Sequence, residues 1–163
     1  MSAVMRPHGG MLISISFLVA LVLLILPLPP AWRIYRPDWV LLALIYWNLA
    51  LPHRVGVGIG WTSGLLEDVL TGTVLGQHAL ANAVVAYLTL KLHLRVRRYP
   101  RWQQTLTVLV LLTLAQLLSL WINGIMGLPV HAWSYWTPAL TGALLWPPVY
   151  RLLRGLRRHY RIG

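Results

Sequence analysis

The chain has 163 residues, of which 58% are hydrophobic and only 10% are charged, and its mean hydropathy is +0.65. These proportions exclude an ordinary soluble domain of this length and indicate an integral membrane protein. The formal net charge is +11, from 14 Lys and Arg against 3 Asp and Glu. The basic residues gather in short connections and the C-terminal tail, so their placement argues against a nucleic-acid partner. The chain has no cysteine, which excludes disulfides and Cys-ligated metals.

Six apolar runs predict six transmembrane helices in one bundle, at about 11–28, 38–51, 55–70, 73–90, 104–122 and 138–153. The first is interpreted as a retained helix, because no small-x-small cleavage site follows it. The second and third are short for a full crossing, so a re-entrant pair is the alternative. Pro147 and Pro148 must kink or interrupt the last helix. Residues 1–163 are predicted to form a single membrane domain that ends in a basic tail, 154–163.

Charge asymmetry orients the predicted helices. With six spans, both termini and the basic loop 91–101 share one side, and only Arg33 and Arg36 fall on the other. Because Lys and Arg accumulate on the cytoplasmic side, both termini are predicted to lie in the cytoplasm, with the spans in an inner membrane. Contacts with anionic lipid are expected from the basic clusters, represented by Arg95, Arg97, Arg98, Arg151, Arg154 and Arg158.

The most distinctive stretch is 56–80, where one helix face carries a repeated small residue. Glycine or aspartate recurs at every fourth position, in the order Gly56, Gly60, Gly64, Asp68, Gly72 and Gly76. A face without side chains favours close packing in lipid, where helices have no hydrophobic drive to associate. We interpret this stripe, together with Asp38 and Trp39 at the start of the second span, as an intramembrane packing or partner surface.

The three carboxylates, Asp38, Glu67 and Asp68, fall near the outer ends of the second and third spans. One interpretation is a proton- or cation-binding cluster in a transporter. The favoured one makes Asp38 a helix N-cap that also pairs with Arg33 or Arg36, and lets Asp68 cap or pair across the predicted tight turn 71–76. Adjacent residues project roughly 100° apart around a helix, so Glu67 and Asp68 cannot both face one partner. Asp68 is the one on the stripe.

Gln77, His78 and Asn82 form a polar patch at the start of the fourth span, which could line a small cavity. The simpler interpretation of His78 is a histidine with satisfied hydrogen bonds, since no paired-histidine spacing supports a metal. No nucleophile, nucleotide-binding or zinc signature occurs in the sequence. We therefore predict no catalytic residue, no cofactor and no metal.

Two segments resemble a known family. Pro37-Asp38-Trp39 is followed by GLLEDVLTGTVLGQHAL at 64–80, which fits a pattern of roughly P-D-W and then G-x-x-x-D-x-x-x-G-x-x-x-G-x-x-A-L. With LPHRVG after the second run, the chain length, the six runs and the basic tail, the chain resembles the MreD family of bacterial rod shape-determining membrane proteins. The form with LGQHAL is similar to those of gammaproteobacteria.

The resemblance implies a component of the elongasome, which builds lateral-wall peptidoglycan. It implies MreC as a direct partner, and MreB, RodA and its penicillin-binding transpeptidase as members of the same complex. It also implies a fold similar to the six-helix substrate-binding subunits of energy-coupling-factor transporters. A non-catalytic scaffold or regulator is the leading hypothesis, and a protein that binds or transports a small molecule or lipid precursor is the alternative. An enzyme acting on lipid-linked precursors is a third possibility.

Overall fold

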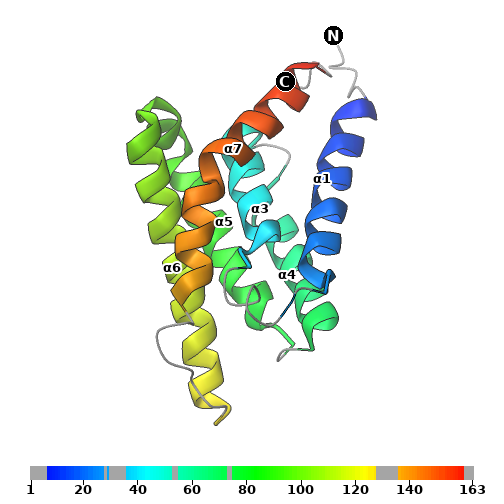
Figure 1. Ribbon diagram of the computed structural model, residues 1–163, viewed down its shortest axis with the longest axis vertical. Coiled ribbons are helices and arrows are strands. Elements are labelled where there is room, and N and C mark those ends of the chain that lie inside the picture. The colour runs from blue at the N-terminus through cyan, green and yellow to red at the C-terminus, as the bar shows by residue number, and fades with distance from the viewer. Residues whose placement is uncertain are drawn as a thin grey trace.

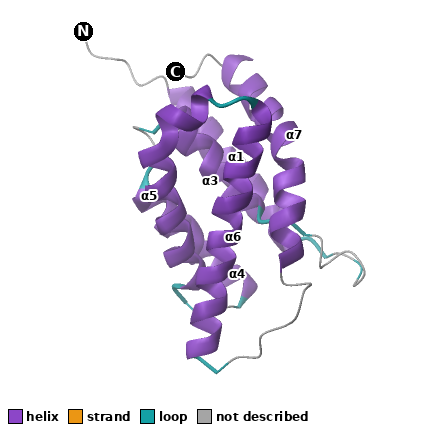
Figure 2. Ribbon diagram, turned by 90° about the vertical axis from the view of Figure 1, so that its left-hand side faces the viewer, coloured by secondary structure: helices purple, strands orange, loops and turns teal. Residues whose placement is uncertain are grey.

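The computed structural model describes residues 7–27, 29, 36–52, 55–72, 75–127 and 136–159. All regular structure in these ranges is helical (Figure 2). The helices are α1 (Pro7–Ile25), α3 (Trp39–Ala50), α4 (Val57–Thr71), α5 (Gln77–Arg98), α6 (Arg101–Ile125) and α7 (Thr137–His159). Parts of the predicted spans and tail lie outside the described residues, at 28, 73–74 and 160–163, and so does Arg33.

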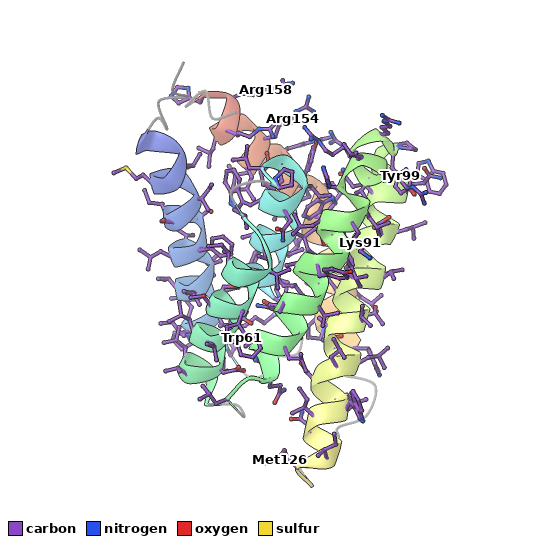
Figure 3. All side chains as sticks on the ribbon, turned by 180° about the vertical axis from the view of Figure 1, so that it is seen from behind. Trp61, Lys91, Tyr99, Met126, Arg154 and Arg158 are labelled. Carbon is purple, nitrogen blue, oxygen red and sulfur yellow. The ribbon has the colours of Figure 1, made fainter. Side chains whose placement is uncertain are left out.

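The helices run alternately up and down, so that α1 begins and α7 ends at the same end of the molecule (Figure 1). Arg154, Arg158 and Tyr99 lie toward this end, and Met126 lies at the opposite one (Figure 3). We call the region where α5 and α7 end the basic end. The opposite region, where α3 begins, α4 ends and α5 begins, contains all three carboxylates and is called the carboxylate end.

Two described helices, α5 and α6, are long and apolar enough to cross a membrane. They have 22 and 25 residues, which at about 1.5 Å per residue exceeds a hydrocarbon core of about 30 Å. Shorter apolar helices occur at Gly10–Ile25 and Trp39–Ala50. The all-helical architecture is confirmed, whereas six full crossings stay a prediction.

Helix α3 lies at the centre of the packing. Its residues 40–49 are all buried, and it contacts α1, α4, α5 and α7. Asp38 begins the helix as predicted, because its side chain accepts a hydrogen bond from the Leu41 N–H at 3.1 Å. The Trp47 indole donates to the Ser16 hydroxyl at 2.7 Å and ties α3 to α1. A short apolar helix therefore forms the core of the chain.

Two helices extend further than the apolar pattern predicted. Helix α5 continues to Arg98, so most of the basic segment expected to be a loop is helical. Lys and Arg are good helix formers, and a basic last turn favours the negative end of the helix dipole. Helix α7 likewise includes the first part of the tail, to His159, and runs through Pro147 and Pro148. It bends along its length (Figure 1), which agrees with the predicted kink.

Candidate functional site

Gly60 and Gly64, in the first part of the glycine stripe, pack against α5. A Cβ atom added to Gly64 would come within 2.4 Å of the Ala79 Cα, and one added to Gly60 within 2.9 Å of the Asn82 carbonyl oxygen. Both distances are shorter than real Cβ contacts, so only glycine fits at these positions. Gly60 and Gly64 therefore face a helix of their own chain. Their role at a partner surface stays a prediction.

The later glycines of the stripe have a different role. Gly72 follows α4 with φ +71°, and Gly76 precedes α5 with φ +100°, and nothing lies within 4 Å of a Cβ added to either. These are left-handed backbone conformations that glycine adopts without strain. The stripe thus consists of a packing part on α4 and a turn part between α4 and α5. The sequence period alone does not separate the two.

Asp68 caps the beginning of α5 from the last turn of α4. Its Oδ2 accepts from the Gly76 N–H at 2.9 Å, and its Oδ1 accepts from the His78 N–H at 2.9 Å. A longer contact joins Oδ2 to the Ala79 N–H at 3.4 Å. The first N–H groups of a helix have no partner within it, and a carboxylate there is also favoured by the helix dipole. Asp68 is 1% exposed, so these hydrogen bonds satisfy a buried carboxyl group.

His78 is held by the same carboxylate. Its ring Nδ1 lies 2.8 Å from the Asp68 Oδ1, and its side chain is 23% exposed. A histidine whose Nδ1–H donates to a carboxylate presents Nε2 to its other neighbours. Asp68 therefore fixes both the backbone and the ring of His78.

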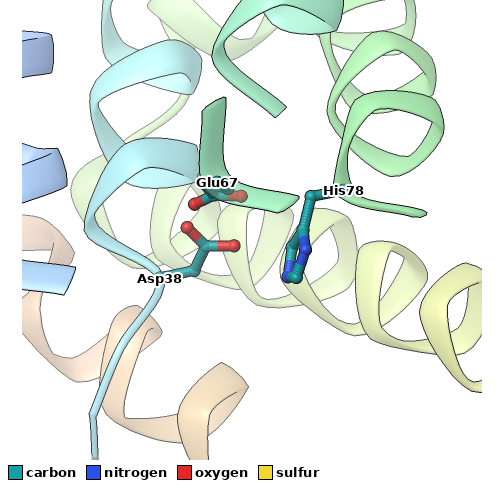
Figure 4. Close-up of side chains that lie close together, drawn as sticks. All are labelled: Asp38, Glu67 and His78. Carbon is teal, nitrogen blue, oxygen red and sulfur yellow. The ribbon is translucent and has the colours of Figure 1, made fainter. Parts of the chain in front are cut away.

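Glu67 points in another direction, toward Asp38 and Asn82. It is 1% exposed, and its Oε2 accepts from the Asn82 Nδ2 at 3.5 Å. Its other oxygen, Oε1, is buried without a hydrogen-bond partner among the described residues, and the carboxyl groups of Glu67 and Asp38 face each other (Figure 4). Two carboxyl groups can form a hydrogen bond only when a proton lies between them.

Asp38, Glu67 and His78 form a compact group that we call the carboxylate cluster. One ligand atom from each lies within 4.8 Å of the others. Carboxylate oxygens and an imidazole nitrogen are a ligand set that divalent metals such as Mn²⁺ and Zn²⁺ accept. Near the cluster, the buried Asn82 Oδ1 and Gln77 Oε1 have no hydrogen-bond partner among the described residues. The cluster can therefore share a proton or hold a cation.

The sequence interpretation placed Asp68, Gln77, His78 and Asn82 near this region, and it gave Glu67 a role only in the less favoured proton- or cation-binding cluster. The structure brings Glu67 close to Asp38. The sequence could not predict this proximity from residue spacing, because the two residues belong to separate elements.

The arginines of the sequence interpretation lie elsewhere. Arg36 donates to the carbonyl groups of Leu24 and Leu26 at the end of α1. The six arginines predicted to meet lipid occur on the last turns of α5 and in the second half of α7, near the basic end (Figure 3).

The described residues form apolar helices, with a buried polar cluster at one end and basic helix termini at the other. These features fit a small helical membrane protein. Residues 5–156 match the family described as rod shape-determining protein MreD. A relative named "Rod shape-determining protein MreD", from Haemophilus influenzae, is 32% identical over 146 residues, which are 90% of each chain. The chain belongs to the MreD family. Membership gives it a role in rod-shape determination and confirms the resemblance inferred from the two motifs.

No solved structure matches the chain. The likeness to energy-coupling-factor subunits therefore stays a prediction. The name of the Haemophilus relative describes shape determination and no catalytic activity.

Proposed function

We propose that this protein is a non-catalytic component of the machinery that elongates the bacterial cell wall, and that it acts from the inner membrane. The observation that supports this proposal is the family match over residues 5–156. The polar groups add to it, because Asp68 is used in capping a helix and Asp38 in capping another. A capping carboxylate is occupied by backbone N–H groups, which suits a structural role.

The proposed direct partner is MreC, with MreB, RodA and its penicillin-binding transpeptidase in the same assembly. Both chain termini are proposed to lie in the cytoplasm. Support for this orientation comes from the basic last turns of α5 and α7, since basic residues accumulate on the cytoplasmic side of membrane proteins. The carboxylate end then lies toward the periplasmic side.

The experiment is co-purification with MreC in mild detergent. The amount of MreC retained per chain is measured for wild type, for Asp68→Ala and for Gly58→Ala. Gly58 is an exposed α4 residue with nothing within 4 Å of an added Cβ, so it serves as the control. We expect a stoichiometric complex that Asp68→Ala weakens and Gly58→Ala retains, and we expect Asp68→Ala to give rounded cells. Monodisperse wild-type protein that retains no MreC contradicts the direct partnership.

Ligand binding is the second candidate function, and the carboxylate cluster favours it. The observation is the convergence of three ligand atoms within 4.8 Å beside buried amide oxygens without partners. The test is a thermal shift of purified protein with Mn²⁺ or Zn²⁺, with Mg²⁺ for comparison and Glu67→Gln as the variant. A ligand that binds only the folded state raises the melting temperature as its concentration increases. Equal melting curves with and without the metals contradict a cation site.

A further inference from the structure

A second polar site lies at the basic end, far from the carboxylate cluster. A cavity of about 110 Å³ opens between α3, α5, α6 and α7. Its polar lining consists of Tyr46, Arg97, Gln104, Tyr150, Arg154 and Arg157. The cavity is several times the share of one water molecule, which is roughly 30 Å³ in the liquid. It therefore has room for a group of several heavy atoms.

The cavity is strongly positive. Three of its lining side chains are guanidinium groups, and no lining residue is acidic. The only three Asp and Glu residues of the chain lie at the carboxylate end. Asp38 precedes the Tyr46 position on α3 by eight residues, which corresponds to about 12 Å of helix. No acidic side chain of this protein is thus placed to neutralise the cavity.

Tyr46 contributes to the cavity a buried hydroxyl group that needs a hydrogen-bond acceptor. Tyr46 is 1% exposed, and its hydroxyl has no hydrogen-bond partner among the described residues. Leaving such a group unsatisfied is costly, so buried polar groups normally have a partner. Since Tyr46 lines the cavity beside Arg154 and Arg157, an acceptor bound there would receive its hydrogen bond.

The cavity walls are held by contacts within the chain. The Gln104 Oε1 accepts from the Trp146 indole at 3.1 Å. The Tyr150 ring packs against Tyr46 with 5.6 Å between ring centroids, and the Arg154 guanidinium lies 6.0 Å from the Tyr150 ring centroid. Aromatic packing and cation–π contacts restrict the orientations of these side chains. Arg154 and Arg157 are half-buried, in contrast to the exposed Arg151 on the same helix.

The helix dipole explains only part of this arrangement. Basic residues in the last turn stabilise the negative end of a helix, and this accounts for exposed arginines at the ends of α5 and α7. It does not account for a buried hydroxyl without an acceptor, or for the convergence of Arg97 and Arg157, from two helix ends, with Arg154 around one cavity. Both features are explained by an anion.

We propose that this cavity binds one phosphate group, with Arg97, Arg154 and Arg157 facing its oxygens and the Tyr46 hydroxyl donating to it. Guanidinium groups match phosphate geometry through paired N–H donors, which makes arginine the preferred residue for such sites. The phosphate can belong to the headgroup of an anionic phospholipid or to a free phosphate ion. The site goes beyond the proposed role in shape determination, and its test does not depend on that role.

The first experiment measures lipid and phosphate binding to the purified full chain. Retained phosphatidylglycerol is quantified by native mass spectrometry after reconstitution with phosphatidylglycerol and phosphatidylcholine, and inorganic phosphate is titrated in a thermal-shift assay in phosphate-free detergent solution. The double variant Arg154→Gln with Arg157→Gln is compared with Arg95→Gln with Arg151→Gln. The control pair is exposed, does not line the cavity and removes the same charge.

We expect the cavity variant to weaken binding at least tenfold, which is the usual scale for losing charge-assisted hydrogen bonds of about 1.4 kcal/mol or more. The arginines of the control pair are themselves expected to meet anionic lipid at the membrane surface, so the control pair should bind inorganic phosphate as wild type does and lose much less lipid than the cavity variant. Binding of phosphatidylglycerol alone identifies the lipid headgroup as the source, and binding of inorganic phosphate as well identifies a site for phosphate in general. Equal losses in the two double variants overturn the proposal, because general charge would then explain binding. Binding of neither ligand by folded wild-type protein also overturns it.

Tyr46→Phe separates ligand binding from folding. The change keeps the ring and its contact with Tyr150, and removes only the hydroxyl that has no partner. Without phosphate or anionic lipid, we expect a melting temperature equal to or above that of wild type. With ligand, we expect the affinity to fall several-fold. An unchanged affinity in Tyr46→Phe shows that the hydroxyl does not touch the ligand and contradicts the proposed geometry.

Discussion

Asp68 and His78 are joined twice, through the His78 backbone N–H at 2.9 Å and through its ring Nδ1 at 2.8 Å. Both contacts use the same carboxylate oxygen, Oδ1. Asp68 therefore positions the beginning of α5 and orients the ring of His78. One buried side chain holds a helix terminus together with the imidazole of the carboxylate cluster.

Asp68→Ala is expected to destabilise the protein more than Asp68→Asn. Alanine removes every acceptor from the Gly76 and His78 N–H groups, and losing a cap costs about 0.5–2 kcal/mol, with buried unsatisfied groups adding to it. Asparagine retains one oxygen that can accept one of these bonds. The melting temperatures of the two variants, measured by thermal unfolding in detergent, show whether their stabilities have this order. A melting temperature for Asp68→Ala equal to that of wild type would show that the cap does not stabilise α5.

Gly64→Ala and Gly58→Ala are expected to change stability in opposite directions. At Gly64 the added methyl group would meet the α5 backbone at 2.4 Å, so the helices must separate, and overpacking of this kind costs about 1–3 kcal/mol. At Gly58 nothing lies within 4 Å, so alanine improves helix propensity by up to about 1 kcal/mol. Both single variants are compared by thermal unfolding at equal protein concentration. A shift of the same sign and size at the two positions rules out close packing at Gly64.

Much of the architecture could be predicted from the apolar runs, because each run identifies a helix and its approximate length. Helix ends were less predictable where charged residues continue the helix, as at Lys91 to Arg98 on α5. Hydropathy identifies the apolar residues, whereas helical hydrogen bonding can continue past the last apolar residue into a charged segment. The cap at Asp38 could be predicted because it depends on neighbouring residues of the chain.

The candidate site could be predicted only where its geometry depends on residues that are neighbours in the sequence. The period of four placed Asp68 on the same face as the glycines. The angle between neighbours predicted that Glu67 and Asp68 could not both face one partner, yet both bond to α5, Glu67 through Asn82 and Asp68 through His78. Glu67 also points toward the start of α3 (Figure 4). What lies in that direction depends on the position of α3, which the sequence of α4 does not contain. Hence the proximity of Glu67 to Asp38 and the cavity around Tyr46, which lies between four helices, could be found only from the three-dimensional arrangement.

Glu67→Gln tests whether the carboxylate cluster shares a proton. If a proton lies between Glu67 and Asp38, glutamine replaces a neutral carboxyl group, and its amide can donate toward Asp38 and accept from Asn82. We expect stability within about 1 kcal/mol of wild type, as for replacement of one hydrogen-bonding group by another. Glu67→Leu, which cannot bond to either neighbour, is expected to be less stable. Equal destabilisation by glutamine and leucine indicates instead that the charge of Glu67 is required, as a bound cation would need.

Ser16→Ala is expected to loosen the attachment of α1 to the central helix, whereas Ser14→Ala is not. The Ser16 hydroxyl donates to the Ile13 carbonyl at 2.7 Å and accepts from the fully buried Trp47 indole at 2.7 Å. Alanine leaves that indole N–H without a partner, and hydrogen bonds between membrane helices contribute about 0.6–2 kcal/mol. Ser14 is exposed two residues earlier on the same helix, so it controls for propensity and lipid contact. Thermal unfolding and the emission maximum of the tryptophans should change in Ser16→Ala alone. Matching changes in both variants would place the effect in α1 itself, and not in its hydrogen bond to α3.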